Sequence, residues 1–300
     1  MKRILFLCLL LVPFTGVLAQ QLDSSQVNKK RLRLVAGSTS AIYVTSMVGL
    51  GTVWYEDLGK FHFFDDNSGW RYMDKWGHAA TAYQTGRIGI GVFRWTGMRE
   101  RQAIWIGGSI GFAFLTSVEI FDGMSEDWGF SWGDVGANAL GTGLAIGQEL
   151  LWQESRISIK WSYRNSRYAQ YRPNLLGEGP SERWLKDYNG QTYWVSANIH
   201  SFISNKSSRF PKWLNVAIGY GAEGMTGADR NPEFNEAGEA LPTFRRYAQV
   251  YFGPDIDLSR IKTDKKALKF LFQVLSFVKF PLPALEYNPV DGLKFNALGF

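Results

Sequence analysis

Two long runs without a charged side chain constrain what this chain of 300 residues can fold into. Residues 34–55 form a run of 22 residues, and residues 102–118 form a run of 17. Because about 20 apolar residues in a helix span the hydrocarbon core of a bilayer, the first run is long enough to cross a membrane. Serine and threonine residues keep it only moderately apolar, so a helix in a soluble core is the alternative.

The composition favours an envelope or membrane protein. Charged residues make up 20% of the chain, below the roughly 25% of an average soluble domain, while aromatic residues reach 15%. This excludes an intrinsically disordered chain, which has few aromatic residues and high charge. The one cysteine excludes a disulfide scaffold. The net charge of +6 is spread along the chain, which argues against nucleic acid as a partner.

The N-terminus has the pattern of a secretory signal peptide over residues 1–19. Lys2 and Arg3 precede an apolar stretch at residues 4–12, and small residues then lead to a cleavage site after Ala19. A true N-terminal transmembrane helix is the alternative, although the apolar stretch is short for one. Cleavage would remove two basic residues and leave a net charge of about +4.

The N-terminal half is expected to be mainly α-helical. Short turns between the helices predict an antiparallel bundle of about four membrane-type helices over residues 34–155, after a polar segment at residues 20–33. Small residues recur inside the helices in G-x-x-x-G patterns, which let helix backbones approach closely in a membrane. The helices are expected at residues 34–55, 74–95, 102–118 and 131–152, and the glycine pairs are Gly107 with Gly111 and Gly143 with Gly147.

The C-terminal half, residues 156–300, is expected to be a smaller extension of strands and loops. Residues 262–280 read as a basic amphipathic helix, which suits either a membrane interface or packing on the strands. The chain ends on an aromatic residue, as outer-membrane proteins often do. The strands are expected at residues 192–199, 213–220 and 247–261, the last broken near Pro254, with two short strands around residues 288–292 and loops at residues 163–187 and 221–242.

Three short polar strings interrupt the apolar helices. The first string, residues 74–78 followed by Tyr83, begins the second predicted helix. The second string, residues 119–123, ends the third helix, and the third string, residues 131–138, begins the fourth. In an antiparallel bundle these three points lie at the same end, so the strings are predicted to converge on one polar site. Its candidate residues are Asp74, Lys75, His78, Tyr83, Glu119, Asp122, Asp134 and Asn138.

The helix dipole divides the acidic residues into two groups. Asp74 and Asp134 lie at helix N-termini, where a carboxylate is favoured, and Ser131 with Asp134 fits a capping box. Helix capping is therefore the alternative to a functional role for these two. Glu119 and Asp122 lie at a helix C-terminus, where the dipole disfavours negative charge.

A positive group is expected to compensate these acids: Lys75, protonated His78 or a metal ion. If the site is catalytic, His78 with Glu119 forms the acid/base pair, and Asn138 positions the substrate. Asp122 and Asp134 then hold a cation or orient the base. No organic cofactor is indicated, and a divalent metal ion is compatible with Asp122, Asp134 and His78 as ligands.

The sequence leaves open whether the chain is an enzyme. In the alternative, the same residues form a buried ion-pair network that fixes helix register in a non-catalytic structural or assembly protein with an envelope-protein partner.

These strings resemble the YfiM-like family of predicted periplasmic or outer-membrane lipoproteins, a domain of unknown function. More loosely, they are similar to VanZ-like membrane proteins, which carry D-K-x-x-H, a glutamate and D-x-x-A-N-x-x-G. The resemblance covers residues 34–152 through Asp74-Lys75, His78, Tyr83, Glu119, Asp122-Gly123, Ser131, Asp134, Ala137-Asn138 and Gly141.

The resemblance implies an envelope location and a shared polar site, with no established activity. The chain departs from lipoprotein members because its cysteine, Cys8, lies inside the signal segment and not at the cleavage site. Attachment is then expected through the helices or the C-terminal half. The expected location is the outer membrane or the periplasmic membrane surface of a Gram-negative-type bacterium, and the expected ligand is a membrane lipid or a lipid-linked glycan.

Overall fold

The computed structural model describes residues 27–53, 59–126, 128–203, 210–235 and 238–299. The predicted signal peptide, the first half of the polar segment at residues 20–33, the end of the first predicted helix and Phe300 lie outside the described residues. The chain forms two compact units. The helical unit comprises the described residues up to 65, residues 81–153 and residues 263–271, and the sheet unit comprises residues 66–80, 154–262 and 272–299.

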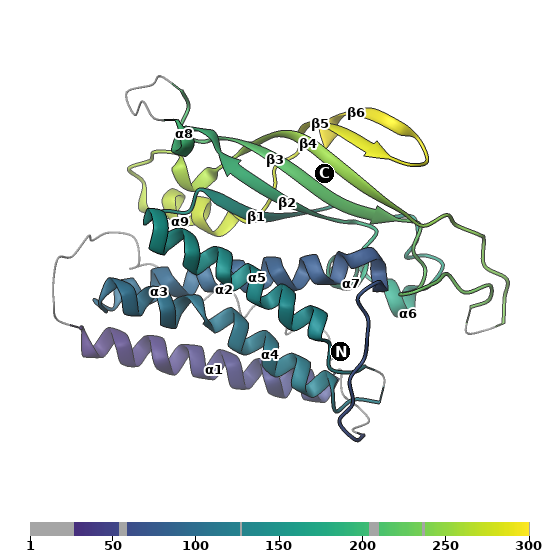
Figure 1. Ribbon diagram of the computed structural model, residues 1–300, viewed down its shortest axis with the longest axis horizontal. Coiled ribbons are helices and arrows are strands. Elements are labelled where there is room, and N and C mark those ends of the chain that lie inside the picture. Colours follow the sequence, from purple (N-terminus) through teal and green to yellow (C-terminus); the bar gives the residue numbers. More distant parts are fainter. Residues whose placement is uncertain (1–26, 54–58, 127, 204–209, 236–237, 300) are drawn as a thin grey trace. The chain divides into compact units, whose positions relative to one another are not determined.

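The predicted helices of the N-terminal half are present (Figure 1). They are α1 (Lys29–Val53), α2 (Met73–Trp95), α3 (Glu100–Gly108), α4 (Ile110–Asp122) and α5 (Trp132–Trp152). The predicted helix at residues 102–118 is in fact two, because the α-helix ends at Gly108 and resumes at Ile110. Adjacent glycines at 107 and 108, poor helix formers, precede this break.

Close backbone contacts join the helices of the helical unit. A Cβ added to Gly107 would lie 2.5 Å from the backbone of Gly89 in α2, and one added to Gly111 would lie 2.6 Å from the carbonyl oxygen of Ala82. The first predicted glycine pair therefore packs helices as expected. The second does not, because a Cβ on Gly143 or Gly147 would have no neighbour within 4 Å.

Among the residues that the structure describes, two segments are long and apolar enough to cross a membrane by length and composition, Lys29–Gly51 and Glu100–Asp122. The second contains the break between α3 and α4. Val35 of α1 packs with Phe93 and Ala103.

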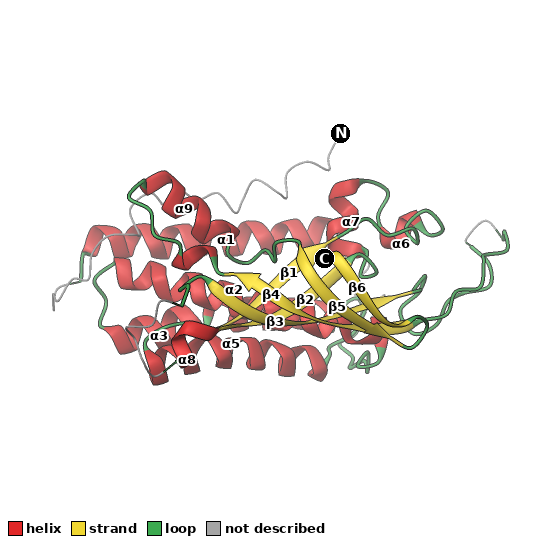
Figure 2. Cartoon of the chain, turned by 90° about the horizontal axis from the view of Figure 1, so that it is seen from above, coloured by secondary structure: helices red, strands yellow, loops and turns green. Residues whose placement is uncertain are grey.

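A six-stranded antiparallel sheet forms the sheet unit, with its strands in sequence order (Figure 2). Each strand pairs with the next along the chain, so the sheet is a meander. The strands are β1 (Ile157–Tyr163), β2 (Gln191–Asn198), β3 (Leu214–Glu223), β4 (Tyr247–Ile256), β5 (Leu282–Asn288) and β6 (Gly292–Gly299).

The sheet differs from the sequence expectation at three places. β1 has no counterpart among the predicted strands. β4 runs unbroken through Pro254, which is tolerated because β4 pairs with β5 only at residues 250–252, leaving the ladder edge open beyond them. Residues 163–187, expected to be a loop, contain two short helices, α6 (Pro173–Leu176) and α7 (Pro180–Lys186), each opened by a proline.

Two further helices complete the described chain. The short helix α8 (Ile199–Phe202) follows β2. The basic amphipathic helix is α9 (Lys266–Leu275), shorter than the predicted residues 262–280. The residues after it extend along β1: the backbone N–H of Trp161 donates to Phe277 at 2.9 Å, and that of Lys279 donates to Trp161 at 2.9 Å.

Candidate functional site

The first polar string forms a connected group in the sheet unit at the start of α2. The Lys75 ammonium lies 2.8 Å from Asp66 and 3.2 Å from Asp74. His78 Nε2 lies 3.9 Å from Asp74 Oδ1, one helical turn away, and the Tyr188 hydroxyl donates to the same oxygen at 2.7 Å. The His78 side chain is 17% exposed and the Asp74 side chain 23%, so the pair is partly accessible to solvent.

The environment keeps Asp74 ionised. Burial alone would raise its pKa, but the positive charges of His78 and Lys75 and the hydrogen bonds from Tyr188 and Lys75 outweigh burial and lower the pKa of Asp74 below its ordinary value. An ionised carboxylate beside a histidine can orient the ring. The pair therefore has the elements of a proton-transfer or anion-binding site.

Tyr188 is held in place by a tight turn before β2. The side-chain amide of Asn189 donates to Asp187 at 2.9 Å and to the carbonyl oxygen of Met225 at 2.8 Å, and the backbone N–H of Met225 donates back to Asn189 at 2.8 Å. The Trp70 ring lies 5.4 Å from that of Tyr188. Tyr188 is thus fixed toward Asp74 by buried hydrogen bonds.

Gly77 lies between Asp74 and His78 on α2 and allows β2 to come close. A Cβ at this position would lie 3.1 Å from the Tyr193 hydroxyl oxygen. That hydroxyl donates to Gln191 at 2.6 Å, and burial raises the pKa of Tyr193 above its ordinary range. Tyr193 therefore stays a neutral hydrogen-bond donor beneath the first string.

The backbone just before α2 is strained. Trp70, Arg71 and Tyr72 adopt left-handed conformations with φ of 49°, 51° and 65°. Non-glycine residues in this region cost on the order of 1–3 kcal/mol each and persist where surrounding contacts hold them. The Tyr220 hydroxyl donates to the carbonyl oxygen of Arg71 at 2.8 Å and supplies one such contact.

The other two strings form a second polar group, which lies in the helical unit. Glu119, Ser131, Asp134 and Asn138 are all at most 3% exposed, and Tyr83 is fully buried. The Ser131 hydroxyl caps α5 by accepting from the backbone N–H of Asp134 at 3.2 Å, so this half of the predicted capping box is confirmed.

Glu119 lies against the N-terminus of α5. Its Oε2 accepts from the backbone N–H of Ser131 at 3.3 Å, in the position that a capping-box glutamate would take within one helix. The positive end of the α5 dipole therefore provides compensation for this buried carboxylate. Asp122 is half-buried at the end of α4.

The predicted site residues thus fall into two groups. Asp74, Lys75 and His78 belong to the sheet unit, and the remaining candidates belong to the helical unit. The convergence of the three strings, the pairing of His78 with Glu119 and a metal site that includes His78 stay predictions.

The sequence interpretation missed Asp66 and Tyr188. Asp66 follows an aromatic loop without periodicity, and Tyr188 lies in a turn 114 residues beyond Asp74. Nothing in the local pattern of either residue signals a partner so distant in the chain.

Comparison with known families covers all eight candidate residues. Residues 60–149 match a family described as "Predicted periplasmic lipoprotein (DUF2279)". No curated protein and no solved structure matches the chain. The match supports an exported, envelope-associated protein similar to a family of unknown function. The narrower relations to YfiM-like and VanZ-like proteins stay predictions.

Proposed function

We propose that this chain is a membrane protein of the cell envelope whose helical unit lies in a bilayer and whose Asp74–His78 pair binds or acts on the polar headgroup of a lipid or lipid-linked glycan. The polarity of α5 carries the membrane part of this proposal. Its polar residues Asp134, Asn138, Gln148 and Glu149 are at most 6% exposed.

Ile146 and two alanines of α5 are buried as well, but other large apolar residues of this helix are exposed. Trp132 is 67% exposed, and Leu140 and Leu151 are each 75% exposed. A helix on a protein surface in water shows the opposite pattern, with its apolar side buried. Polar residues turned inward and apolar residues turned outward suit a helix surrounded by lipid.

The other helices of this unit support the same proposal. On α1, Leu34, Val44 and Val48 are each more than half exposed, and this helix includes one of the candidate spans. Of the two buried acids of α5, Glu149 forms an ion pair, since Arg94 Nη2 lies 2.6 Å from Glu149 Oε2. Glu149 and Arg94 are therefore paired with each other, and the exposed residues named on α1 and α5 are apolar, as a lipid environment requires.

Membrane extraction tests the embedded helices. We expect the chain to remain with the membrane fraction in high salt and in alkaline carbonate, because both remove proteins held by charge alone. Val48→Lys, which places a charge in the middle of α1, is expected to increase the extracted fraction, whereas Val48→Leu is expected to behave like the parent. Complete release of the parent chain by salt would refute the embedded helical unit.

The headgroup role of the Asp74–His78 pair is supported by its partial exposure, its charges and the strained backbone before it. The chain has three histidines, His62, His78 and His200, so their ring resonances can be followed together by NMR. Titration of the detergent-solubilised protein with a polyisoprenyl phosphate is expected to shift the resonances of His78 and leave the other two in place. Asp74→Asn is expected to abolish the shift. Three unmoved histidines would refute the headgroup site.

A second candidate function is a non-catalytic structural or assembly role. The buried contact between Glu119 and Ser131 favours it, since such networks fix helix register. Complementation of a deletion strain separates the two. Loss of envelope function in His78→Gln at unchanged protein level supports the headgroup site, with His200→Gln as the matched control. Function retained in His78→Gln but lost together with protein level in Glu119→Ala supports the structural role.

A further inference from the structure

The two faces of the sheet have opposite chemistry along β3 to β6. Side chains alternate between faces along a strand, and one alternate set is entirely uncharged. Within it, Ile218, Val250, Phe252, Tyr287 and Phe295 are between 46% and 69% exposed. We call this set the outer face, and it consists of Val216, Ile218, Ala248, Val250, Phe252, Pro254, Pro283, Leu285, Tyr287, Leu293 and Phe295. Tyr220, which belongs to the same alternate set, is left out because its ring stacks on Trp76.

The opposite, inner face is largely buried and combines an apolar cluster of Trp194, Ala217, Tyr251 and Ala284 with buried polar side chains. Glu286 is 8% exposed, and its carboxylate accepts hydrogen bonds from the side-chain amides of Gln249, Asn288 and Asn296 at 3.0, 2.8 and 2.7 Å. A soluble protein would place its apolar side chains on the buried face and its polar side chains in water. Here the exposed face carries large apolar side chains, and the buried face carries charged ones beside its apolar cluster.

The inner face also holds a buried ion pair. The Lys160 ammonium lies 2.6 Å from Asp255 Oδ2, and the two side chains are 1% and 0% exposed. The Ser196 hydroxyl donates to the same carboxylate oxygen at 2.6 Å, and Lys160 also donates to the carbonyl oxygen of Ile256 at 2.7 Å. The charged side chains of Lys160 and Asp255 therefore lie on the inner face and are paired there, and the outer face contains no charged residue.

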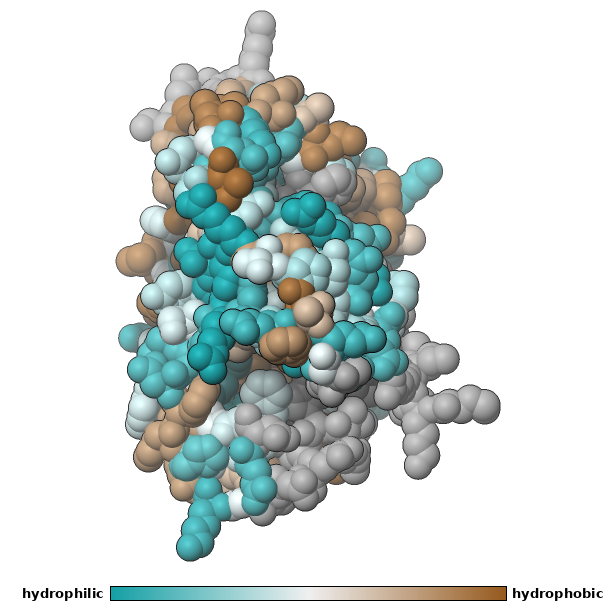
Figure 3. Space-filling view, turned by 90° about the vertical axis from the view of Figure 1, so that its right-hand side faces the viewer, coloured by the Kyte–Doolittle hydropathy of each residue, from teal (hydrophilic) through white to brown (hydrophobic). Residues whose placement is uncertain are grey.

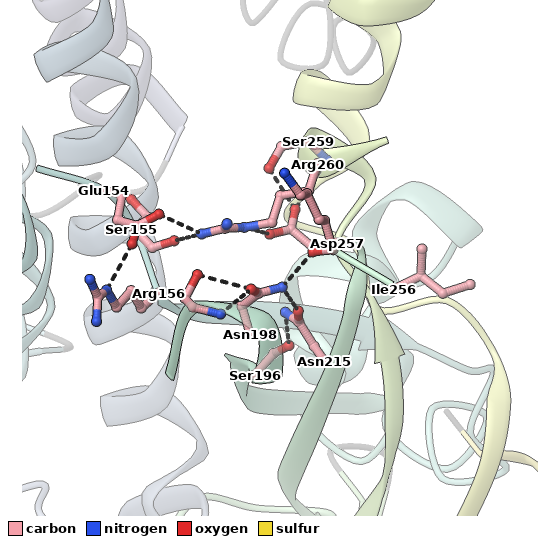
Figure 4. Close-up of polar contacts among 12 residues, drawn as sticks. Glu154, Ser155, Arg156, Ser196, Asn198, Asn215, Ile256, Asp257, Ser259 and Arg260 are labelled. Carbon is pink, nitrogen blue, oxygen red and sulfur yellow. Dashed lines mark hydrogen bonds and ion pairs between the residues drawn. The ribbon is translucent and has the colours of Figure 1, made fainter. Parts of the chain in front are cut away.

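Charged residues gather at the ends of the strands. At one end, Arg260 donates to Ser155 and Asp257 at 2.8 and 3.1 Å, and Asn198 donates to Asn215 at 2.7 Å (Figure 4). At the other end lie Arg164 paired with Glu223, together with Arg245, Arg246, Asp291 and Lys294.

The height of the uncharged zone between these ends fits a bilayer. β3 and β4 are each 10 residues long, and a strand that crosses a membrane needs about 9–11 residues. β5 and β6 have 7 and 8 residues, so they cover only part of that height. Figure 3 shows one side of the molecule, with several hydrophobic residues in its upper part.

We infer that the outer face of β3 to β6 contacts the acyl chains of a bilayer, with the charged strand ends at the two polar surfaces. This inference rests on the proposed membrane location and extends it to the sheet unit. We assign lipid to this face because charged residues are absent from the face and present at both ends of the strands. A bilayer has the same order, with a hydrocarbon core between two polar surfaces. A protein partner would not require a polar, internally paired inner face.

Spin-label accessibility tests this inference in the full chain. Single-cysteine variants Phe252→Cys, Phe295→Cys, Arg245→Cys and Val48→Cys are made with Cys8→Ala, labelled with a nitroxide and reconstituted into vesicles of phosphatidylethanolamine and phosphatidylglycerol. Collisions with oxygen, which concentrates in hydrocarbon, and with a water-soluble nickel chelate are then measured. We expect the oxygen-to-nickel ratio to be several-fold higher at Phe252 and Phe295 than at Arg245.

The positions give distinct results for the two proposals. A high ratio at Val48 with water-like values at Phe252 and Phe295 would overturn the inference for the sheet and leave the embedded helical unit standing. Water-like values at all three would overturn both. Low collision rates with both reagents at Phe252 and Phe295 would indicate a protein partner and would also overturn the inference. Circular dichroism of each variant checks that the sheet is intact.

Discussion

The contact between Gly107 and Gly89 predicts that one added methyl group destabilises the helical unit. The substitution Gly107→Ala places a Cβ 2.5 Å from the carbonyl carbon and oxygen of Gly89 and from the backbone nitrogen of Ile90. All three are backbone atoms, so no flexible side chain can move aside. The helices must separate or shift to accommodate the methyl group.

Two terms set the size of the effect. Replacing glycine by alanine in a helix gains up to about 1 kcal/mol of propensity, and overpacking a tight contact costs about 1–3 kcal/mol. Gly143→Ala offers the matched control, because it is also within a helix and a Cβ there meets nothing within 4 Å. The difference between the two variants cancels the propensity term and isolates the packing cost.

Unfolding in mixed micelles, followed by circular dichroism as the denaturing detergent increases, measures this difference. We expect Gly107→Ala to be less stable than Gly143→Ala by about 1–3 kcal/mol, with Gly143→Ala at least as stable as the parent. Equal stabilities of the two variants would refute the argument that α2 and α3 meet through their glycine backbones. A larger loss in Gly143→Ala than in Gly107→Ala would show that the α5 glycine pair packs a helix after all.

Three further variants test contacts of the polar groups. Ser131→Ala removes the cap of α5 and is expected to lower the unfolding free energy by about 1 kcal/mol, whereas Ser131→Thr should retain most of it in the same titration. Tyr188→Phe removes a hydrogen bond that lowers the pKa of Asp74. Because that pKa is depressed in the folded protein, the stability it contributes is present at neutral pH and is lost as the pH falls through the folded-state pKa. In Tyr188→Phe the pKa of Asp74 should be higher, so this stability should be lost at a higher pH. An NMR titration of the Asp74 carboxyl group measures that pKa. Lys160→Met leaves Asp255 buried without its ion-pair partner and is expected to cost about 3–5 kcal/mol in denaturant unfolding. An unchanged midpoint would show that the pair is not needed to compensate the buried carboxylate.

The helices could be predicted from the sequence because each is an apolar run bounded by charges. The break between α3 and α4 could not, since it depends on a local backbone conformation inside an uncharged segment. β1 was missed because Lys160 interrupts its apolar pattern. That lysine is buried only through Asp255, which lies 95 positions further along the chain, and no window of local sequence contains both partners.

The sequence indicates which residue types make up the candidate site, but it does not indicate which groups these residues contact. The capping role of Ser131 follows from a spacing of three residues and is confirmed. The sequence predicts a cation as the partner of Glu119, which stays a prediction, and the structure adds a helix N-terminus through the backbone N–H of Ser131. Backbone groups carry no sequence signal, so this partner could be found only from the fold.

The pairing of β1 with the residues after α9 bears on the order in which the chain can fold. One edge of β1 bonds to β2, and the other is closed only when residues 277–279 arrive. Until more than nine-tenths of the sequence has been exported, that edge keeps unpaired backbone donors and acceptors, which can pair with another chain. A chain held back or cut short at α9 would carry an open template for aggregation. The sheet of this protein is therefore protected at that edge only at the last step of its synthesis and export.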